Sequence, residues 1–125
     1  MRYVLMMLAV LGLPAQAATP VSAEALLQQQ AAQADLLVLD VRSAEEFAAG
    51  HVPGAINVPL PDVSAAHPQL KSWKDRQVVV YCRSGRRSEL AIKTLEAAGF
   101  SRVLHLEGDM LGWEAARRSV AVARP

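Results

Sequence analysis

The sequence has a single cysteine among its 125 residues, so no disulfide can form within the chain. If a protein with one cysteine is exported, that cysteine either pairs with another chain or remains a free reactive thiol. A third interpretation is a buried side chain that serves as a small hydrophobic residue, which is common for cysteine. Composition alone favours the third interpretation, and only the neighbours of Cys82 argue against it.

An excess of charge of one sign is also absent. The chain has 13 Lys and Arg against 12 Asp and Glu, a formal net charge of +1. Such a balance gives no indication of binding to nucleic acid or to a membrane surface. The spacing of cysteine and histidine resembles no metal site, so we expect no metal. Internal repeats, low-complexity tracts and linkers are lacking as well.

No hydrophobic run near the N-terminus is long enough to cross a membrane. The apolar segment at residues 4–13 has 10 residues, whereas a spanning helix needs about 20. Arg2 precedes this segment and Ala15-Gln16-Ala17 follows it, which is the pattern of a secretory signal peptide. The alternative, an uncleaved membrane anchor, is disfavoured by the small residues at 15–17.

We therefore expect residues 1–17 to be a signal peptide, cleaved after Ala17 or Ala18, and residues 18–125 to form one domain. The short signal is typical of bacteria, which predicts a periplasmic protein with no membrane attachment after cleavage. Loss of Arg2 from the 13 basic residues leaves 12, equal to the 12 acidic ones.

Predicted strands and helices alternate along this domain. Apolar runs predict strands at 35–41, 55–59, 77–82 and 102–106. Helical spacing predicts helices at 21–30, 43–50, 87–99 and 110–118, with a loop and a weak helix at 60–75 and a frayed tail. The alternation predicts an α/β fold, a parallel sheet with helices on both faces.

Two helix starts have recognisable capping residues. Ser22 is a plausible N-cap for the first helix. Ser43 and Glu46 have the spacing of a capping box, and Gly50 closes the same helix.

Cys82 stands where chemistry is expected in this kind of fold. It ends a buried strand, and ligands of open α/β sheets bind beyond the carboxyl ends of the strands. The loop after it turns into a helix whose N-cap is predicted at Arg87 or Ser88. Gly85 allows unusual backbone angles, so the loop amides can converge on one point as an anion-binding nest.

The neighbours of Cys82 predict a stabilised thiolate. Unpaired amides at a helix N-terminus carry partial positive charge, and Arg83, Arg86 and Arg87 add full charges. Such surroundings favour the nucleophilic thiolate and also bind an anionic substrate. The alternative is that the arginines only decorate an exposed loop.

Two motifs resemble the rhodanese family of sulfurtransferases. "DVRSAEEFAAGHVPGAINVP" at 40–59 is similar to the first conserved block of the family, and "CRSGRRS" at 82–88 is similar to its active-site loop. A weaker third match is "LEGDMLGW" at 106–113. The resemblance implies a single rhodanese-like domain with a five-stranded, mainly parallel sheet flanked by helices on both faces.

The resemblance implies sulfur transfer without a metal or organic cofactor. Cys82 would take the outer sulfur of a small anionic donor such as thiosulfate and pass it to a thiol or cyanide acceptor, or to a sulfur-accepting protein. The resemblance assigns substrate binding to the loop, with its arginines holding the donor and its amides the persulfide. These residues are Arg83, Ser84, Gly85, Arg86, Arg87 and Ser88.

Two other functions stay open. The chain could be a persulfide carrier that loads sulfur without rapid turnover. It could also be a phosphatase or arsenate reductase, but related enzymes of that kind have one more residue in the loop. Here six residues run from Cys82 through Arg87, which favours sulfur over phosphate.

Departures from the family pattern leave the donor open. The loop shares Arg83 with thiosulfate enzymes and Ser84 with mercaptopyruvate enzymes. Glu46 stands where larger relatives have a substrate-binding arginine. Asp109 replaces a glycine, and a cap for the last helix is one role for it.

Other polar residues receive mainly structural interpretations. Asp40 and Arg42 end a strand on the active-site edge, and we expect them to pair and fix the next loop, with tuning of the pocket as the alternative. His51 is expected to bond its own turn rather than donate a proton. Trp73 and Trp113 are expected to pack, and His67 and His105 receive no role.

Overall fold

The computed structural model describes residues 18–123, so the predicted signal peptide lies outside the described residues. Five strands occupy β1 (Thr19–Val21), β2 (Leu36–Asp40), β3 (Ile56–Asn57), β4 (Gln77–Tyr81) and β5 (Val103–Leu106). Four helices occupy α1 (Ala23–Ala31), α2 (Ala44–Ala49), α3 (Arg86–Ala97) and α4 (Asp109–Ala115), and two 3-10 turns occupy η1 (Leu60–Asp62) and η2 (Lys71–Trp73). In the span 18–123, no helix has the length and apolar character to cross a membrane.

The five strands form one parallel sheet in the order β1-β5-β4-β2-β3. This confirms the predicted fold class. The strand that local sequence did not predict is β1, which pairs with β5 from Thr19 opposite Leu104 to Val21 opposite Leu106. Three residues that include a proline are too short to show a strand pattern, so only the partner strand defines it.

The central strands are buried on both faces, which explains their continuous apolar sequence. Leu37 and Leu39 of β2 belong to one core cluster, whereas Val38 between them belongs to the other. In β4, Val80 and Tyr81 divide in the same way. Successive side chains of a strand point to opposite faces, so both faces need apolar residues.

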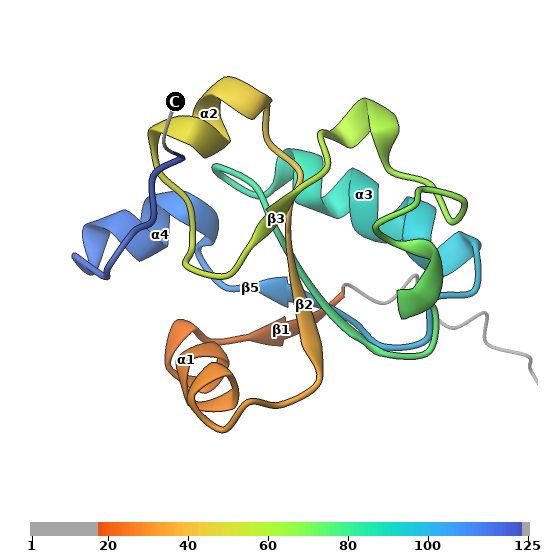
Figure 1. The fold of residues 1–125 in the computed structure, drawn as a ribbon, viewed down its shortest axis with the longest axis horizontal. Coiled ribbons are helices and arrows are strands. Elements are labelled where there is room, and N and C mark those ends of the chain that lie inside the picture. The colour runs from red at the N-terminus through yellow and green to blue at the C-terminus, as the bar shows by residue number, and fades with distance from the viewer. Residues whose placement is uncertain (1–17, 124–125) are drawn as a thin grey trace, which may run out of the picture.

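Helices cover the two faces of the sheet (Figure 1). On one face α3 packs through Ala91, Ile92 and Leu95, alongside the segment that contains η1 and η2. On the other face lie α1 and α4, with Leu26, Met110 and Trp113 buried. The packing role expected for Trp113 is confirmed, and its ring N–H donates to the Ser119 carbonyl at 2.9 Å.

The predicted capping box of α2 is present. The Ser43 hydroxyl accepts the Glu46 amide at 3.2 Å, and the Glu46 carboxylate accepts the Ser43 amide at 3.3 Å. Gly50 is the C-cap, as predicted. Local hydrogen bonds therefore fix where α2 begins and where it ends.

The C-terminal segment is paired rather than frayed as far as residue 123. Ala121 exchanges two backbone hydrogen bonds of 2.9 Å with His51, and the Ala123 amide donates to the Ala48 carbonyl at 3.2 Å. The expectation of a frayed tail is therefore wrong for these residues. Their partners are Ala48 at the end of α2 and His51 just after it, which come far earlier in the chain, so no local signal indicates them.

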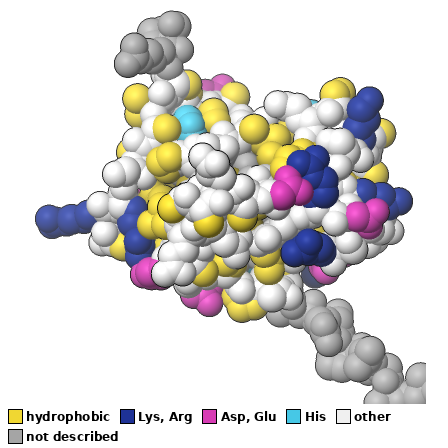
Figure 2. All heavy atoms as spheres, turned by 60° about the horizontal axis from the view of Figure 1, so that its bottom comes forward, with side chains coloured by type: hydrophobic (Ala, Val, Ile, Leu, Met, Phe, Trp, Pro, Cys, Tyr) yellow, Lys and Arg dark blue, Asp and Glu magenta, His cyan; other side chains and the backbone are white. Residues whose placement is uncertain are grey.

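Charged side chains do not gather in one basic patch on the face shown in Figure 2. They occur there singly or in neighbouring groups of opposite sign. An exposed ion pair of the described residues joins Arg76 and Asp35. Exposed pairs of this kind contribute little to stability.

We expect Leu95→Ala to lower the free energy of unfolding by about 2–5 kcal/mol, because it leaves a cavity under α3. Leu95 is fully buried, whereas Leu90 of the same helix is 49% exposed. Leu90→Ala is the matched control and should change stability by less than about 0.5 kcal/mol. Urea titration followed by circular dichroism measures both, and equal losses in the two variants would contradict the packing described here.

Candidate active site

The site lies where β4 ends and α3 begins. Cys82 follows the last residue of β4, and Gly85 is the N-cap of α3 with φ +116°. The predicted N-cap, Arg87 or Ser88, is therefore wrong. The left-handed backbone of Gly85 reverses the chain sooner, so that its carbonyl accepts the Glu89 amide at 3.0 Å as the first helical bond.

The sulfur of Cys82 is buried but has polar neighbours. Cys82 is 1% exposed and belongs to the core cluster on the α3 face. Its Sγ nevertheless accepts the Gly85 amide at 3.1 Å and lies 3.4 Å from Ser88 Oγ. A thiolate is a stronger acceptor than a thiol, so an amide aimed at sulfur suits a reactive cysteine better than a packing residue.

The first turn of α4 holds the loop in place. The Met110 amide donates to the Cys82 carbonyl at 2.9 Å, and the Leu111 amide donates to the Arg83 carbonyl at 3.1 Å. These contacts join two segments that are far apart in the sequence. They fix the backbone on which the sulfur sits, independently of the arginines.

The three loop arginines have different surroundings. Arg83 and Arg86 are exposed, as is Ser84. Arg87 is half-buried and forms a two-point ion pair with Glu46, with N–O distances of 2.6 and 2.9 Å. The Arg87 guanidinium lowers the pKa of Glu46 to about 2. Glu46 thus has a second role beside its capping box, which sequence reasoning did not find.

Asp40 and Arg42 form a buried ion pair, as expected from the sequence. The Arg42 guanidinium donates to both Asp40 oxygens at 2.7–3.1 Å and to the Gly50 carbonyl at 2.7 Å. Asn57 donates to the Asp40 and Arg42 carbonyls at 3.0 and 2.9 Å. The pair therefore joins β2, β3 and the end of α2 beneath the site.

His51 has the structural role expected for it. Its Nδ1 lies 2.8 Å from the Phe47 carbonyl, and its ring stacks on Phe47 with centroids 3.6 Å apart. Trp73 packs against the α3-side core, which confirms its packing role.

A shallow groove of about 200 Å³ adjoins the loop. Two arginines, two glutamates and apolar side chains line it, with contributions from α2, the loop and α4: Arg42, Glu46, Ala49, Gly50, Arg83, Met110, Leu111 and Glu114. Among the described residues, no cluster of three His, Cys, Asp or Glu side chains could hold a metal.

Two site residues were not assigned to the site from the sequence. Asp109 does not cap α4, whose N-cap is Gly108 without a side-chain bond. Asp109 has φ +52°, and its carboxylate instead accepts the Cys82 amide at 3.0 Å. His105 lies 2.9 and 3.0 Å from the two Asp109 oxygens and 2.9 Å from Ser88 Oγ. One feature of the sequence could have placed His105 in the site: it lies near the carboxyl end of β5, the strand beside β4, and ligands bind at that edge of the sheet.

Hydrogen bonds shift the pKa of both residues. The bond to Asp109 raises the pKa of His105. Burial opposes ionisation of Asp109, but the bonds from His105 and from the Cys82 amide hold the pKa of Asp109 below its usual value. The charged forms are thus favoured together.

The model of the rhodanese-like domain matches residues 20–116, which include the loop and Asp109. The chain belongs to the rhodanese family. A sulfurtransferase of Allochromatium vinosum is 36% identical over 84% of this chain and 94% of its own length. YrkF of Bacillus subtilis, named as a candidate sulfur carrier protein, is 34% identical over 74% of this chain and 49% of its own length.

A solved structure supports the same assignment. The thiosulfate sulfurtransferase of Pseudomonas aeruginosa matches 85% of this chain and 21% of its own, with a TM-score of 0.75 and 27% identity. These relatives place this rhodanese domain among the sulfur-transfer proteins.

We expect Asp40→Ala to destabilise the domain by about 3–5 kcal/mol, because it leaves the Arg42 guanidinium buried without its carboxylate. Arg42 is only 5% exposed. Asp35→Ala, which breaks the exposed pair with Arg76, is the matched control and should cost less than about 1 kcal/mol. Thermal unfolding measures both losses, and a stable Asp40→Ala variant would show that this ion pair does not support the site.

Proposed function

We propose that this rhodanese domain is a thiosulfate sulfurtransferase that carries the sulfur as a persulfide on Cys82. The observation that supports it is the position of Sγ at the N-terminus of the 12-residue helix α3, with the Gly85 amide 3.1 Å away. Unpaired amides of a helix N-terminus stabilise a thiolate and attract an anionic donor. The N-terminus of α3 thus favours both the thiolate that attacks and the anionic donor that is attacked.

In the first step, the Cys82 thiolate attacks the outer sulfur of thiosulfate. A bond forms between Sγ and that sulfur, and the sulfur–sulfur bond of thiosulfate breaks. Sulfite leaves with the electron pair, and Cys82 carries a persulfide. The loop amides from Arg83 to Ser88 and the partial charge of α3 stabilise the terminal sulfur, which bears the negative charge.

In the second step, a thiolate or cyanide acceptor attacks the terminal sulfur. A bond forms between the acceptor and that sulfur, the bond to Sγ breaks, and Cys82 leaves as a thiolate. Protons and electrons balance over the two steps without an added oxidant or reductant. The enzyme therefore returns to its starting state after each transfer.

The groove beside the loop suits a small anion. Its volume of about 200 Å³ is below the roughly 300–1,000 Å³ of pockets for drug-sized ligands. Arg83 lines it and is exposed, so its charge is available to a donor. Arg87 is held by Glu46 and contributes mainly through that fixed ion pair. We therefore assign donor attraction chiefly to Arg83 and Arg86.

Thiosulfate should add the mass of one sulfur atom to the protein, and Cys82→Ser should add none and show no turnover with cyanide. Intact mass spectrometry reads the loading, and thiocyanate formation reads the turnover. Ser72→Ala, which changes an exposed side chain of η2 outside the loop, is the control variant and should still load. Sulfur uptake by Cys82→Ser, or no uptake by the native chain, would refute the proposal.

A persulfide carrier is the second candidate function. The groove is shallow, and Leu111 on its rim is 43% exposed, which offers a partner protein an apolar contact beside the loop. A relative named as a candidate sulfur carrier shares this domain. The same mass experiment separates the two functions, because a carrier loads sulfur fully yet forms little thiocyanate.

We also propose that residues 1–17 direct export to the periplasm. The support is the sequence pattern of a short apolar segment followed by Ala15-Gln16-Ala17. The full chain produced in a bacterium should appear in the periplasmic fraction with a mass that begins at Ala18 or Thr19. Recovery from the cytoplasm with Met1 retained would contradict this proposal, and a chain that lacks residues 2–17 is the control that should stay inside.

A further inference from the structure

A second group of polar side chains is linked to the sulfur by short contacts. Ser88 comes from α3, His105 from β5 and Asp109 from α4. Ser88 and Asp109 are buried, at 0% and 3% exposure, and the His105 side chain is a quarter exposed. Three elements thus bring a hydroxyl, an imidazole and a carboxylate together at one point.

These side chains form a continuous path from the sulfur to the imidazole. Sγ of Cys82 lies 3.4 Å from Ser88 Oγ, and Oγ lies 2.9 Å from His105 Nε2. A serine hydroxyl has one proton to donate and two lone pairs that accept. The Ser88 proton can turn between three acceptors, the Gly85 carbonyl at 2.9 Å, an Asp109 oxygen at 3.0 Å and Nε2 at 2.9 Å. When it points to Nε2, Ser88 can accept a proton from the thiol while it passes its own proton to the ring.

The carboxylate makes Nε2 a favourable place for that proton. Both Asp109 oxygens lie within 3.0 Å of Nε2. A bare Nε2 would face these oxygens with its lone pair, whereas a protonated Nε2 donates to them. The same contact raises the pKa of His105. Asp109 is fixed in turn by the Cys82 amide, which donates to one of its oxygens at 3.0 Å.

Few other charges act on this imidazole. From α3, Glu89 adds a second negative charge that also favours the imidazolium. The charged neighbour of His105 that comes from α4 is Asp109. The titratable neighbour beyond the end of β4 is Cys82. β1, the other neighbour of β5, places Pro20 opposite His105 and has no charged residue. The positive charge of Arg87 acts on Cys82 rather than on His105, and Arg87 is paired with Glu46.

We propose that the Cys82 thiol and His105 form a coupled pair, bridged by Ser88, in which the thiol proton moves to His105 Nε2 and is held against Asp109. The S–H bond breaks, an N–H bond forms, and the neutral ring that accepts the proton carries its other proton on Nδ1. The result is a thiolate with an imidazolium counter-charge. His105 acts through Ser88, so it is a positioning residue, and it sets how much thiolate is present at neutral pH.

This inference deepens the proposed function, because a thiolate is the nucleophile of the first transfer step, and it is tested without any sulfur donor. The ultraviolet absorbance of the thiolate is followed against pH, with Cys82→Ser as the blank. His105→Gln keeps a neutral donor toward Asp109 but cannot carry the charge. We expect its thiolate titration to move to higher pH by about one pH unit, a tenfold change in the ionisation equilibrium.

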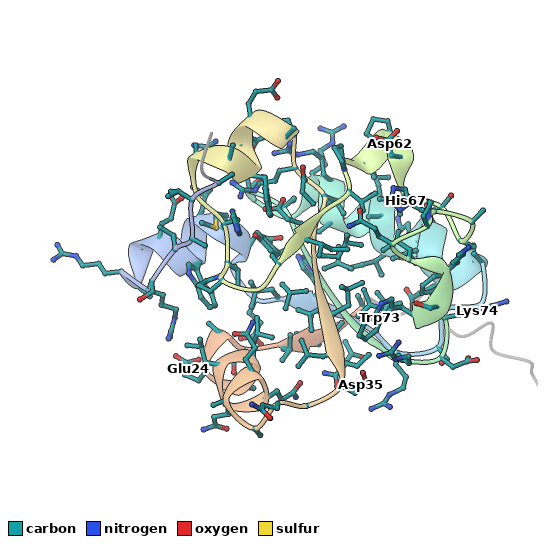
Figure 3. All side chains as sticks on the ribbon, viewed as in Figure 1. Glu24, Asp35, Asp62, His67, Trp73 and Lys74 are labelled. Atoms are coloured by element: carbon teal, nitrogen blue, oxygen red, sulfur yellow. The ribbon has the colours of Figure 1, made fainter. Side chains whose placement is uncertain are left out.

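His67→Gln is the matched control. His67 lies in the segment between η1 and η2, on the other side of the molecule from α4 (Figure 3). Its variant should titrate as the native protein does. A His105→Gln titration that coincides with the native one would overturn the proposal.

A second measurement decides the matter should His105→Gln fail to fold. The His105 ring is titrated by nuclear magnetic resonance in the native protein and in Cys82→Ser. A thiolate stabilises the imidazolium, so the ring should titrate at higher pH in the native protein than in Cys82→Ser. Equal titrations would overturn the coupling. Coupling without sulfur loading would instead refute the proposed function and leave this inference intact.

Discussion

Gly85 holds a backbone angle of φ +116°, and the geometry around the sulfur depends on it. At this angle the chain leaves Cys82, turns within three residues and enters α3, and the Gly85 amide lies 3.1 Å from Sγ. A side chain would be strained here, and its Cβ would lie 3.2 Å from an Asp109 oxygen and 3.6 Å from His105 Cε1. Gly85 therefore gives the loop its shape and leaves room for the side chains of Asp109 and His105.

The sheet supplies the frame that this turn requires. β4 is central and buried on both faces, so its end has little freedom to move, and Cys82 inherits a fixed position. The register places His105 opposite Val80, close to the same edge. The buried Asp40–Arg42 pair fixes the neighbouring edge at the end of β2. Apolar packing thus determines where the polar residues meet, and hydrogen bonds determine their orientation.

The sequence predicts those parts of this structure that depend on interactions between residues close together in the chain. Alternating strands and helices, the capping box of Ser43 and Glu46, and Cys82 at a strand end each depend on a few neighbouring residues. The N-cap at Gly85 was predicted two or three residues late, because Ser88 is also a good cap by type. Its hydroxyl instead accepts no cap bond and contacts the sulfur and Asp109.

What the sequence did not predict involves partners that are distant along the chain. β1 is a strand because β5 lies beside it, and the 120–123 segment pairs with Ala48 and His51 at and after the end of α2. The Glu46–Arg87 pair and the place of His105 and Asp109 in the site likewise join separate elements. Residue type gave no indication of these contacts, since a histidine in a strand and an acid at a helix start are ordinary features.

The distribution of charge around Cys82 changes the physical account of its reactivity. From the sequence, the three arginines were expected to add positive charge around Cys82, with mere decoration of an exposed loop as the alternative. In the structure Arg87 is paired with Glu46, and Arg83 and Arg86 are exposed, where water screens their charge. The groups that remain close to the sulfur in a buried setting are one amide, one hydroxyl and the helix terminus. Directed hydrogen bonds act at full strength where water is excluded. Under the proposed function, these groups, together with His105 through Ser88, would favour the thiolate more than the arginines do. Under the proposed function, the exposed arginines would attract the anionic donor from solution, while the groups around Sγ would activate the nucleophile.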